Sequence, residues 1–291
     1  MWILERASVP TPLTRPSEAE RRLRADVERW AVPRHAFVNR AANRMVRDEI
    51  AGAFAALDLT VALVGPHENV LALPRERTAG RPLTLIAAHY DSVPHCPGAD
   101  DNASGVAIMM ECARSLAGAH DVGFVAFNRE EDGLVGSLDF VAETFPTLGF
   151  PLRAAHVLEM VGFRKRDGAA QALPLPGLGA AKRTPDFIGV LGKGATNGDV
   201  AEAVGQDAAP GLRVLGAKTW GPMHRVFPDL TQSDHFAFWQ RGLPATLWTD
   251  TAYFRNPNYH QPTDTPDTLD YAFMRDVAEL LVAVVRARGA R

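Results

Sequence analysis

Five short apolar runs, separated by stretches of helical periodicity, constrain the fold of this chain most strongly. A continuous apolar run of five or six residues is typical of a strand that is buried on both faces of a sheet. Strands that alternate with helices pair mostly in parallel and form an α/β sandwich. We therefore predict an α/β fold with a largely parallel central sheet, whose strands lie at residues 84–88, 122–127, 154–158, 187–191 and 244–248.

The remaining patterns fit a single domain over residues 1–291. Ser17 and Glu20 form a capping-box pattern, which predicts the start of a helix. Residues 1–16 contain three prolines and no periodicity, so we expect an extended N-terminal arm. The other expected elements are helices over 17–31, 38–57, 103–116, 133–145 and 267–286, one or two strands within 59–73, and a long loop over 163–185.

Composition argues against several classes of protein. The 31 basic and 34 acidic residues give a net charge of −3 without any polybasic block, so nucleic acid is not an expected partner. No run approaches about 18 consecutive apolar residues, so we expect no membrane segment. The first residues, 1–6, reach a charge before a signal-type apolar stretch forms. With only Cys96 and Cys112 available, we expect a cytoplasmic protein with two free thiols.

Three of the apolar runs end in residues that can bind metals or transfer protons. His89 and Asp91 follow the first run, Glu130 and Glu131 follow the second, and Glu159 follows the third. In open α/β sheets, ligand sites gather beyond the carboxyl ends of the strands. These three endings therefore indicate one shared site at an edge of the sheet.

Two further segments contribute candidate ligands, Asp101 in a turn at 98–105 and His260 in a loop at 256–265. A mixture of imidazole and carboxylate suits zinc, whereas sets of oxygen ligands alone suit magnesium or calcium. The three pooled carboxylates carry a charge of about −3, which two Zn²⁺ ions and a bridging hydroxide would neutralise. We therefore predict two Zn²⁺ per chain at a site built from His89, Asp101, Glu131, Glu159 and His260, with Glu130 to spare.

Six motifs in this chain resemble those of the co-catalytic di-zinc aminopeptidase family, which also includes glutamate-carboxypeptidase-type peptidases and glutaminyl cyclases. They are H-Y-D-S at 89–92, G-A-D-D-N-A-S-G at 98–105, N-R-E-E-D-G-L-V-G-S at 128–137, L-E-M-V-G at 158–162, S-D-H at 233–235 and N-P-N-Y-H-Q-P-T-D-T at 256–265. They follow the family order and span most of residues 84–288. The resemblance implies a three-layer sandwich in which helices cover both faces of a mixed sheet, with two zinc ions at one edge.

The resemblance also implies a role for each candidate ligand. His89 and Glu159 look like ligands of one zinc, and Glu131 and His260 look like ligands of the other. Asp101 looks like the carboxylate that bridges both ions. Many family members have aspartate where this chain has Glu159, which is one methylene longer.

Three further residues match catalytic positions of the family. Glu130 resembles the general base, and Tyr259 resembles the side chain that helps to hold the developing oxyanion. Asp91 looks like the partner that orients the imidazole of His89. Family members with a bridging aspartate often have a cis peptide after it, so we expect one between Asp101 and Asn102.

We predict that the protein is a zinc-dependent exopeptidase, specifically an aminopeptidase. A metal-bridging hydroxide would attack the scissile carbonyl of a peptide or a small aminoacyl substrate, with Glu130 as general base.

Three alternatives remain open. The first is a single-zinc glutaminyl cyclase, although cyclase-type relatives typically have serine where this chain has Asn102. The second is a carboxypeptidase, for which Arg164, Lys165 and Arg166 could bind a terminal carboxylate. The third is a non-catalytic binding protein on the same fold.

Overall fold

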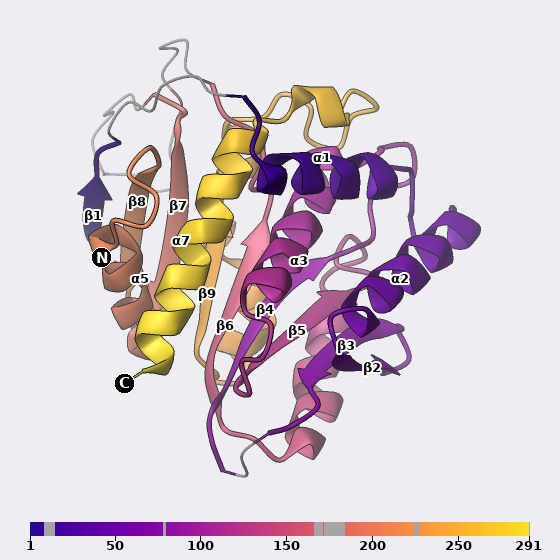
Figure 1. Ribbon diagram of the computed structural model, residues 1–291, viewed down its shortest axis with the longest axis horizontal. Coiled ribbons are helices and arrows are strands. Elements are labelled where there is room, and N and C mark those ends of the chain that lie inside the picture. Colours follow the sequence, from indigo (N-terminus) through magenta and orange to yellow (C-terminus); the bar gives the residue numbers. More distant parts are fainter. Residues whose placement is uncertain (9–14, 78–79, 166–170, 172–183, 224–226, 291) are drawn as a thin grey trace.

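Nine strands form one sheet in the part of the chain that the computed structural model describes, residues 1–8, 15–77, 80–165, 171, 184–223 and 227–290 (Figure 1). The strand order across the sheet is β1-β8-β7-β9-β6-β4-β5-β3-β2. The strands are β1 (Trp2–Arg6), β2 (Leu59–Val64), β3 (Asn69–Pro74), β4 (Leu83–His89), β5 (Val122–Phe127), β6 (Leu152–Glu159), β7 (Phe187–Lys193), β8 (Arg213–Thr219) and β9 (Ala245–Thr249).

Helices cover both faces of this sheet, which confirms the predicted three-layer α/β sandwich. One face packs against α1 (Glu18–Trp30), α2 (Arg40–Ala55), α3 (Gly105–Ser115), α5 (Asn197–Gly205) and α7 (Tyr271–Gly289) (Figure 1). The other face packs against α4 (Val135–Asp139), the π-helical turn η2 (Phe140–Thr144), η3 (Phe145–Leu148) and α6 (His235–Gln240). The remaining short turns are η1 (Ala99–Ser104), η4 (Gly194–Thr196), η6 (Pro228–Thr231), η7 (Ala252–Phe254) and η8 (Pro266–Thr268).

The sheet is mixed, with a parallel centre. Strands β9, β6, β4 and β5 are neighbours and run in the same direction. On one side β3 is antiparallel to β5, and on the other side β7 is antiparallel to β9. The carboxyl ends of the four central strands therefore meet at one edge. The polar residues that follow the apolar runs predicted this arrangement.

The central strands are buried on both faces, which explains their continuous apolar sequence. In β4, Ile86 packs into the core beneath α3 and α7, whereas the adjacent Ala87 packs into the opposite core beneath α6. Both side chains are fully buried. Successive residues of a strand point to opposite faces, so a strand covered on both sides needs apolar residues at nearly every position.

Most of the predicted elements are present. Ser17 caps α1, and its hydroxyl accepts a hydrogen bond from the backbone N–H of Glu20 at 3.2 Å. Residues 59–73 form the two strands of a hairpin, β2 and β3. Cys96 and Cys112 are both free and buried.

Three expectations need correction. The N-terminal arm is not a free extension, because residues 2–6 form β1 and pair antiparallel with β8 at the sheet edge. Strand β8 and helix α5 were not predicted, since glycine and lysine interrupt the apolar pattern of β8 and α5 is short. The predicted helix over 133–145 is instead α4 followed by π-helical and 3₁₀ turns. The predicted loop over 163–185 lies mostly outside the described residues.

Among the described residues, no helix combines the length and the apolar character that crossing a membrane requires.

We expect Ser17→Ala to lower the free energy of unfolding by about 1 kcal/mol, because the N–H of Glu20 loses its capping partner. The matching fall in melting temperature, roughly 2–4 °C, is measurable by thermal denaturation followed by circular dichroism. Ser8→Ala is the matched control, since Ser8 is exposed and outside any helix. Equal melting temperatures for the two variants would show that the cap contributes nothing.

Candidate metal centre

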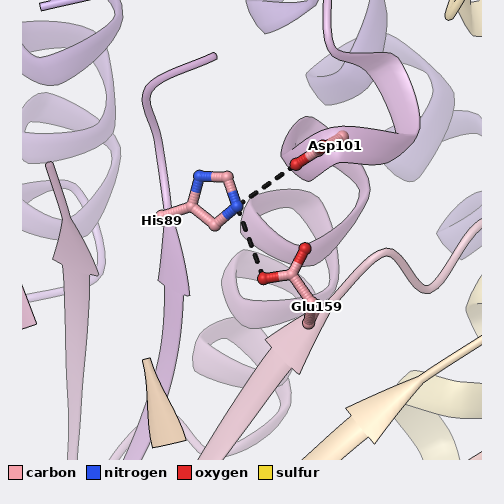
Figure 2. Close-up of side chains that lie close together, drawn as sticks. All are labelled: His89, Asp101 and Glu159. Carbon is pink, nitrogen blue, oxygen red and sulfur yellow. Dashed lines mark ion pairs between the residues drawn. The ribbon is translucent and has the colours of Figure 1, made fainter. Parts of the chain in front are cut away.

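Three predicted ligands meet where β4 and β6 end. His89 is the last residue of β4 and Glu159 is the last residue of the neighbouring β6, while Asp101 lies in η1 above them. Nε2 of His89 is 3.3 Å from Oδ1 of Asp101 and 3.4 Å from Oε2 of Glu159. Figure 2 shows both carboxylates approaching this one ring nitrogen. The longer side chain of Glu159 therefore reaches the same point as Asp101.

The other carboxylate oxygen of Asp101 belongs to a second group. Nε2 of His260 is 3.2 Å from Oδ2 of Asp101 and 3.2 Å from Oε2 of Glu131. Within each group, one potential ligand atom per residue lies within 4.8 Å of the others. Asp101 thus joins two sets of one histidine and one further carboxylate, and all five predicted ligands come together. The side chain of His260 is 33% exposed, so the site opens to solvent on this side.

The Asp101 carboxylate is fixed by the backbone around it. The Asp101–Asn102 peptide is cis, as expected. The side-chain nitrogen Nδ2 of Asn102 donates to the carbonyl of Leu158 at 2.8 Å. The side-chain oxygen Oδ1 of Asn102 accepts from the N–H of Met160 at 3.2 Å. These bonds tie the turn to β6 on both sides of Glu159.

Asp264, four residues after His260, holds the same turn from the opposite side. Its carboxylate accepts the backbone N–H groups of Asp100 and Asp101 at 3.0 and 3.1 Å. Asp264 therefore couples the positions of two predicted ligands, Asp101 and His260. Asp264 lies in the motif at 256–265, but no role was predicted for it.

Asp91 has two sets of contacts, of which only one was predicted. Its Oδ1 is 3.4 Å from Nδ1 of His89, whereas Asp101 approaches the other ring nitrogen, Nε2. The same carboxylate accepts the backbone N–H groups of Glu130 and Glu131 at 3.2 and 3.3 Å. Asp91 thus links the end of β4 to the turn that follows β5.

That turn separates the two glutamates. Oε2 of Glu131 faces His260, whereas Oε2 of Glu130 lies 4.0 Å from Nε2 of His89. The preceding residue, Arg129, has a φ of +62°, a left-handed conformation that bends the chain immediately after β5.

Tyr259 borders the same site. Its ring stacks on the imidazole of His260, with centroids 3.7 Å apart. Burial, with the carboxylates of Asp101 and Glu159, raises the pKa of its phenol above the ordinary value. The hydroxyl therefore stays protonated and can donate a hydrogen bond at neutral pH.

A bound cation would compensate the buried carboxylates. Burial raises the pKa of Glu131 to about 7 and that of Glu130 well above its ordinary value. Burial alone would lower the pKa of His89, but the carboxylates of Glu159 and Glu130 outweigh it and raise the pKa well above the ordinary value. Carboxylates crowded in a buried site cannot all ionise unless positive charge compensates them.

Unsatisfied atoms show where a cation fits. Among the described residues, both ring nitrogens of His89 and Oε1 of Glu131 are buried. None of these three atoms has a hydrogen-bond partner. The contacts of His89 with carboxylates are at ion-pair distance but lack hydrogen-bond geometry. Because these are imidazole nitrogen and carboxylate oxygen donors, the residues fit zinc.

In the motif at 233–235, Ser233 contacts a candidate ligand and Asp234 is buried nearby. The hydroxyl of Ser233 donates to Oε2 of Glu159 at 2.8 Å. Asp234 is fully buried, and neither of its carboxylate oxygens has a hydrogen-bond partner among the described residues. Burial raises the pKa of Asp234 to about 7. Asp234 directly precedes α6, but its side chain makes no capping hydrogen bond.

An apolar pocket opens beside the first ligand group. Its volume, counted up to the open mouth, is about 930 Å³. Glu159 and Tyr259 form its end toward the ligands, and its walls include Leu191, Leu215, Leu230 and Leu247. Ile3 of β1 also lines it, so the corrected N-terminal strand contributes to this pocket.

Comparisons with known proteins show the family of this chain. The model of peptidase family M28 matches residues 69–285. A protein of Escherichia coli named YfbL, described as uncharacterized, is 33% identical over 235 residues, which cover 76% of this chain and 71% of that protein. Aminopeptidase YwaD of Bacillus subtilis is 27% identical over 75% of this chain but only 44% of its own length.

Among solved structures, LapA of Legionella pneumophila superposes with a TM-score of 0.73 at 19% identity, covering 94% of this chain and 73% of that one. At this identity the likeness shows a shared fold alone. The family model covers most of the chain, and the Escherichia coli relative exceeds 30% identity over most of its length. The chain therefore belongs to peptidase family M28, which confirms the predicted enzyme class, a metallo-exopeptidase.

Proposed function

We propose that this chain is a zinc-dependent aminopeptidase that hydrolyses the N-terminal peptide bond of peptides or small aminoacyl substrates. The observation that carries the proposal is the pair of ligand groups that share Asp101, each with one histidine and one glutamate. Residues from position 89 to position 260 contribute to this site, which supports one catalytic domain over residues 1–291.

In this proposal the chain holds two zinc ions. His89, Asp101 and Glu159 hold one ion, and Asp101, Glu131 and His260 hold the other. Zinc, when bound, lowers the pKa of water and polarises a carbonyl oxygen. Asp91 and Ser233 support this arrangement through their contacts with His89 and Glu159.

Glu130 moves the proton. Its carboxylate lies beside His89 without belonging to either ligand group, so it is available to accept a proton from the attacking water. It then returns that proton to the leaving amine, as a general base that becomes a general acid. The hydrogen bond from the N–H of Glu130 to Asp91 keeps the backbone of this residue in place during both transfers.

Tyr259 completes the set. The protonated phenol, stacked on His260 at the end of the apolar pocket, donates a hydrogen bond to the oxyanion that develops on the substrate carbonyl. The apolar pocket beside Glu159 accepts the side chain of the N-terminal residue. Large apolar residues are therefore the preferred N-terminal residues of the substrate.

The two adjacent glutamates provide a direct test of these roles. Glu130→Gln keeps both ligand groups intact but removes the proton acceptor, so we expect unchanged zinc content and a fall in kcat of at least about 100-fold. Glu131→Gln removes a ligand atom, so its zinc content falls and added zinc restores part of the activity. Elemental analysis and leucinamide hydrolysis measure the two effects separately.

A reversed pattern, in which Glu130→Gln loses zinc and Glu131→Gln retains it, would show that the two roles are exchanged. Near-normal activity of both variants would refute the whole assignment. Release of ammonia from a glutaminyl peptide without chain cleavage would instead identify a cyclase.

Metal content tests the number of ions. We expect two zinc ions per chain in protein loaded with zinc and freed of excess by gel filtration. Chelation should abolish hydrolysis and lower the melting temperature, because bound ions stabilise the folded state. Full activity with at most one tightly bound ion would disprove the two-metal arrangement.

Narrowing the apolar pocket tests its role in specificity. We expect the wild type to prefer leucinamide to alaninamide by roughly tenfold or more in kcat/KM, because the larger side chain buries more apolar surface. Ala217→Leu fills part of the pocket and should reduce this preference, with alaninamide as the internal reference. Ala62→Leu, on the exposed side of β2, is the matched control. An unchanged preference in Ala217→Leu would place the substrate side chain elsewhere.

A further inference from the structure

A second pocket, polar and basic, lies beside the turn that carries Glu130. It measures about 610 Å³ up to its open mouth. We call it the arginine pocket, and its charged and polar wall consists mainly of Arg40, Arg44, His67, Asn128 and Arg129. None of the roles proposed above uses this pocket.

Two of its arginines are unpaired. Arg40 and Arg44 are one turn apart on α2, so they lie on the same face of that helix. Within the described ranges of the chain, no carboxylate is at ion-pair distance from either side chain. Arg47 on the same helix differs, because its guanidinium is 2.6 Å from Glu68 and 2.7 Å from Asp48. Arg40 and Arg44 are both exposed to solvent, so their guanidinium groups are accessible to an anionic ligand.

The opposite wall contributes further hydrogen-bond donors. Arg129 donates to Asp132 at 2.9 Å, and its other end lies 3.1 Å from Nδ1 of His67. Arginine can only donate, so His67 accepts at Nδ1 and carries its proton on Nε2, which remains a donor. The guanidinium of Arg129 also lies 4.5 Å from the ring centre of Phe37, which fixes its plane.

The charge of the pocket is therefore net positive. Its one acidic wall residue, Glu68, is paired with Arg47, and the nearby Asp132 is paired with Arg129. Guanidinium groups present several parallel N–H donors, which match the two oxygens of a carboxylate. The pocket therefore fits an anion with paired oxygens, and a peptide substrate carries such a group in its C-terminal carboxylate.

The arginine pocket and the metal centre share one edge of the sheet. Strand β3 runs antiparallel to β5. Residues 67–69, which lead into the start of β3, therefore lie beside the end of β5. The end of β4, with His89, is the next position along this edge. Two strand spacings amount to about 10 Å, which is roughly the length of three extended residues.

We propose that the arginine pocket binds the C-terminal carboxylate of a short peptide, about three residues long, whose N-terminal residue is held at the metal centre. The proposal rests on the proposed aminopeptidase function and narrows its substrates to short peptides with a free C-terminus. Of the three basic residues that the sequence suggested for such a carboxylate, the two that the structure describes have other contacts. Arg164 is 2.7 Å from Asp270, and the ammonium of Lys165 lies over the ring of Phe163. Arg166 lies outside the described residues.

The test compares leucyl-glycyl-glycine with its C-terminal amide, using the full zinc-loaded chain. We expect the wild type to hydrolyse the free acid with a kcat/KM about tenfold higher, mainly through a lower KM, because a charged hydrogen-bonded contact contributes about this much. In the double variant Arg40→Ala, Arg44→Ala the acid-to-amide ratio should fall toward one. Arg241→Ala, an exposed arginine after α6, is the matched control and should keep the wild-type ratio. Added salt should lower the wild-type ratio, since exposed charges are screened.

The same acid-to-amide ratio in the wild type and the double variant would overturn the proposal, provided that circular dichroism shows both proteins folded. If no leucyl substrate is hydrolysed at all, the aminopeptidase function fails, and calorimetric binding of the two tripeptides still tests the pocket. Tighter binding of the acid that disappears in the double variant supports the carboxylate site, and equal binding of acid and amide refutes it.

Discussion

The carboxylate of Asp101 is the interaction on which the rest of the site depends. Its two oxygens point to different histidines, 3.3 Å from His89 and 3.2 Å from His260. A single carboxylate between two basic groups forces the ends of β4 and β6 and the loop before α7 to meet at one place. Burying such a cluster is costly unless every charge is compensated. Hydrogen bonds hold the backbone on either side of this carboxylate: the N–H of Asp101 donates to the carboxylate of Asp264, and the side-chain amide of Asn102 donates to the carbonyl of Leu158.

The surrounding structure places different surfaces on the two sides of this cluster. The apolar pocket lies toward β7 and β8, the candidate metal ligands lie at β4 and β6, and the arginine pocket lies toward α2 and the start of β3. Apolar surface, buried charge and exposed positive charge thus follow one another along a single edge of the sheet. In the proposed function, a short peptide lies along this edge, with its N-terminal side chain in the first pocket and its carboxylate in the last.

Some residues make two sets of contacts, because they join elements that lie far apart in the sequence. Asp91 contacts the imidazole of His89 and also accepts the N–H groups of Glu130 and Glu131. Asn128 and Arg129 line the arginine pocket and immediately precede those two glutamates. The turn after β5 is therefore held from both sides. It places Glu130 toward His89 and Glu131 toward His260.

The sequence by itself determined the layered fold and the pool of ligands, because strands buried on both faces need continuous apolar runs and polar residues then stand out where they end. It also predicted the helix cap at Ser17 and indicated that the separate motifs contribute to one site. Only the tertiary structure decided how the N-terminal segment pairs with β8, that Asp264 and Ser233 support the ligands, and that Arg40 and Arg44 form a pocket with Arg129. Those relations join residues far apart in the chain, and no local periodicity or motif spacing records which distant segments become neighbours.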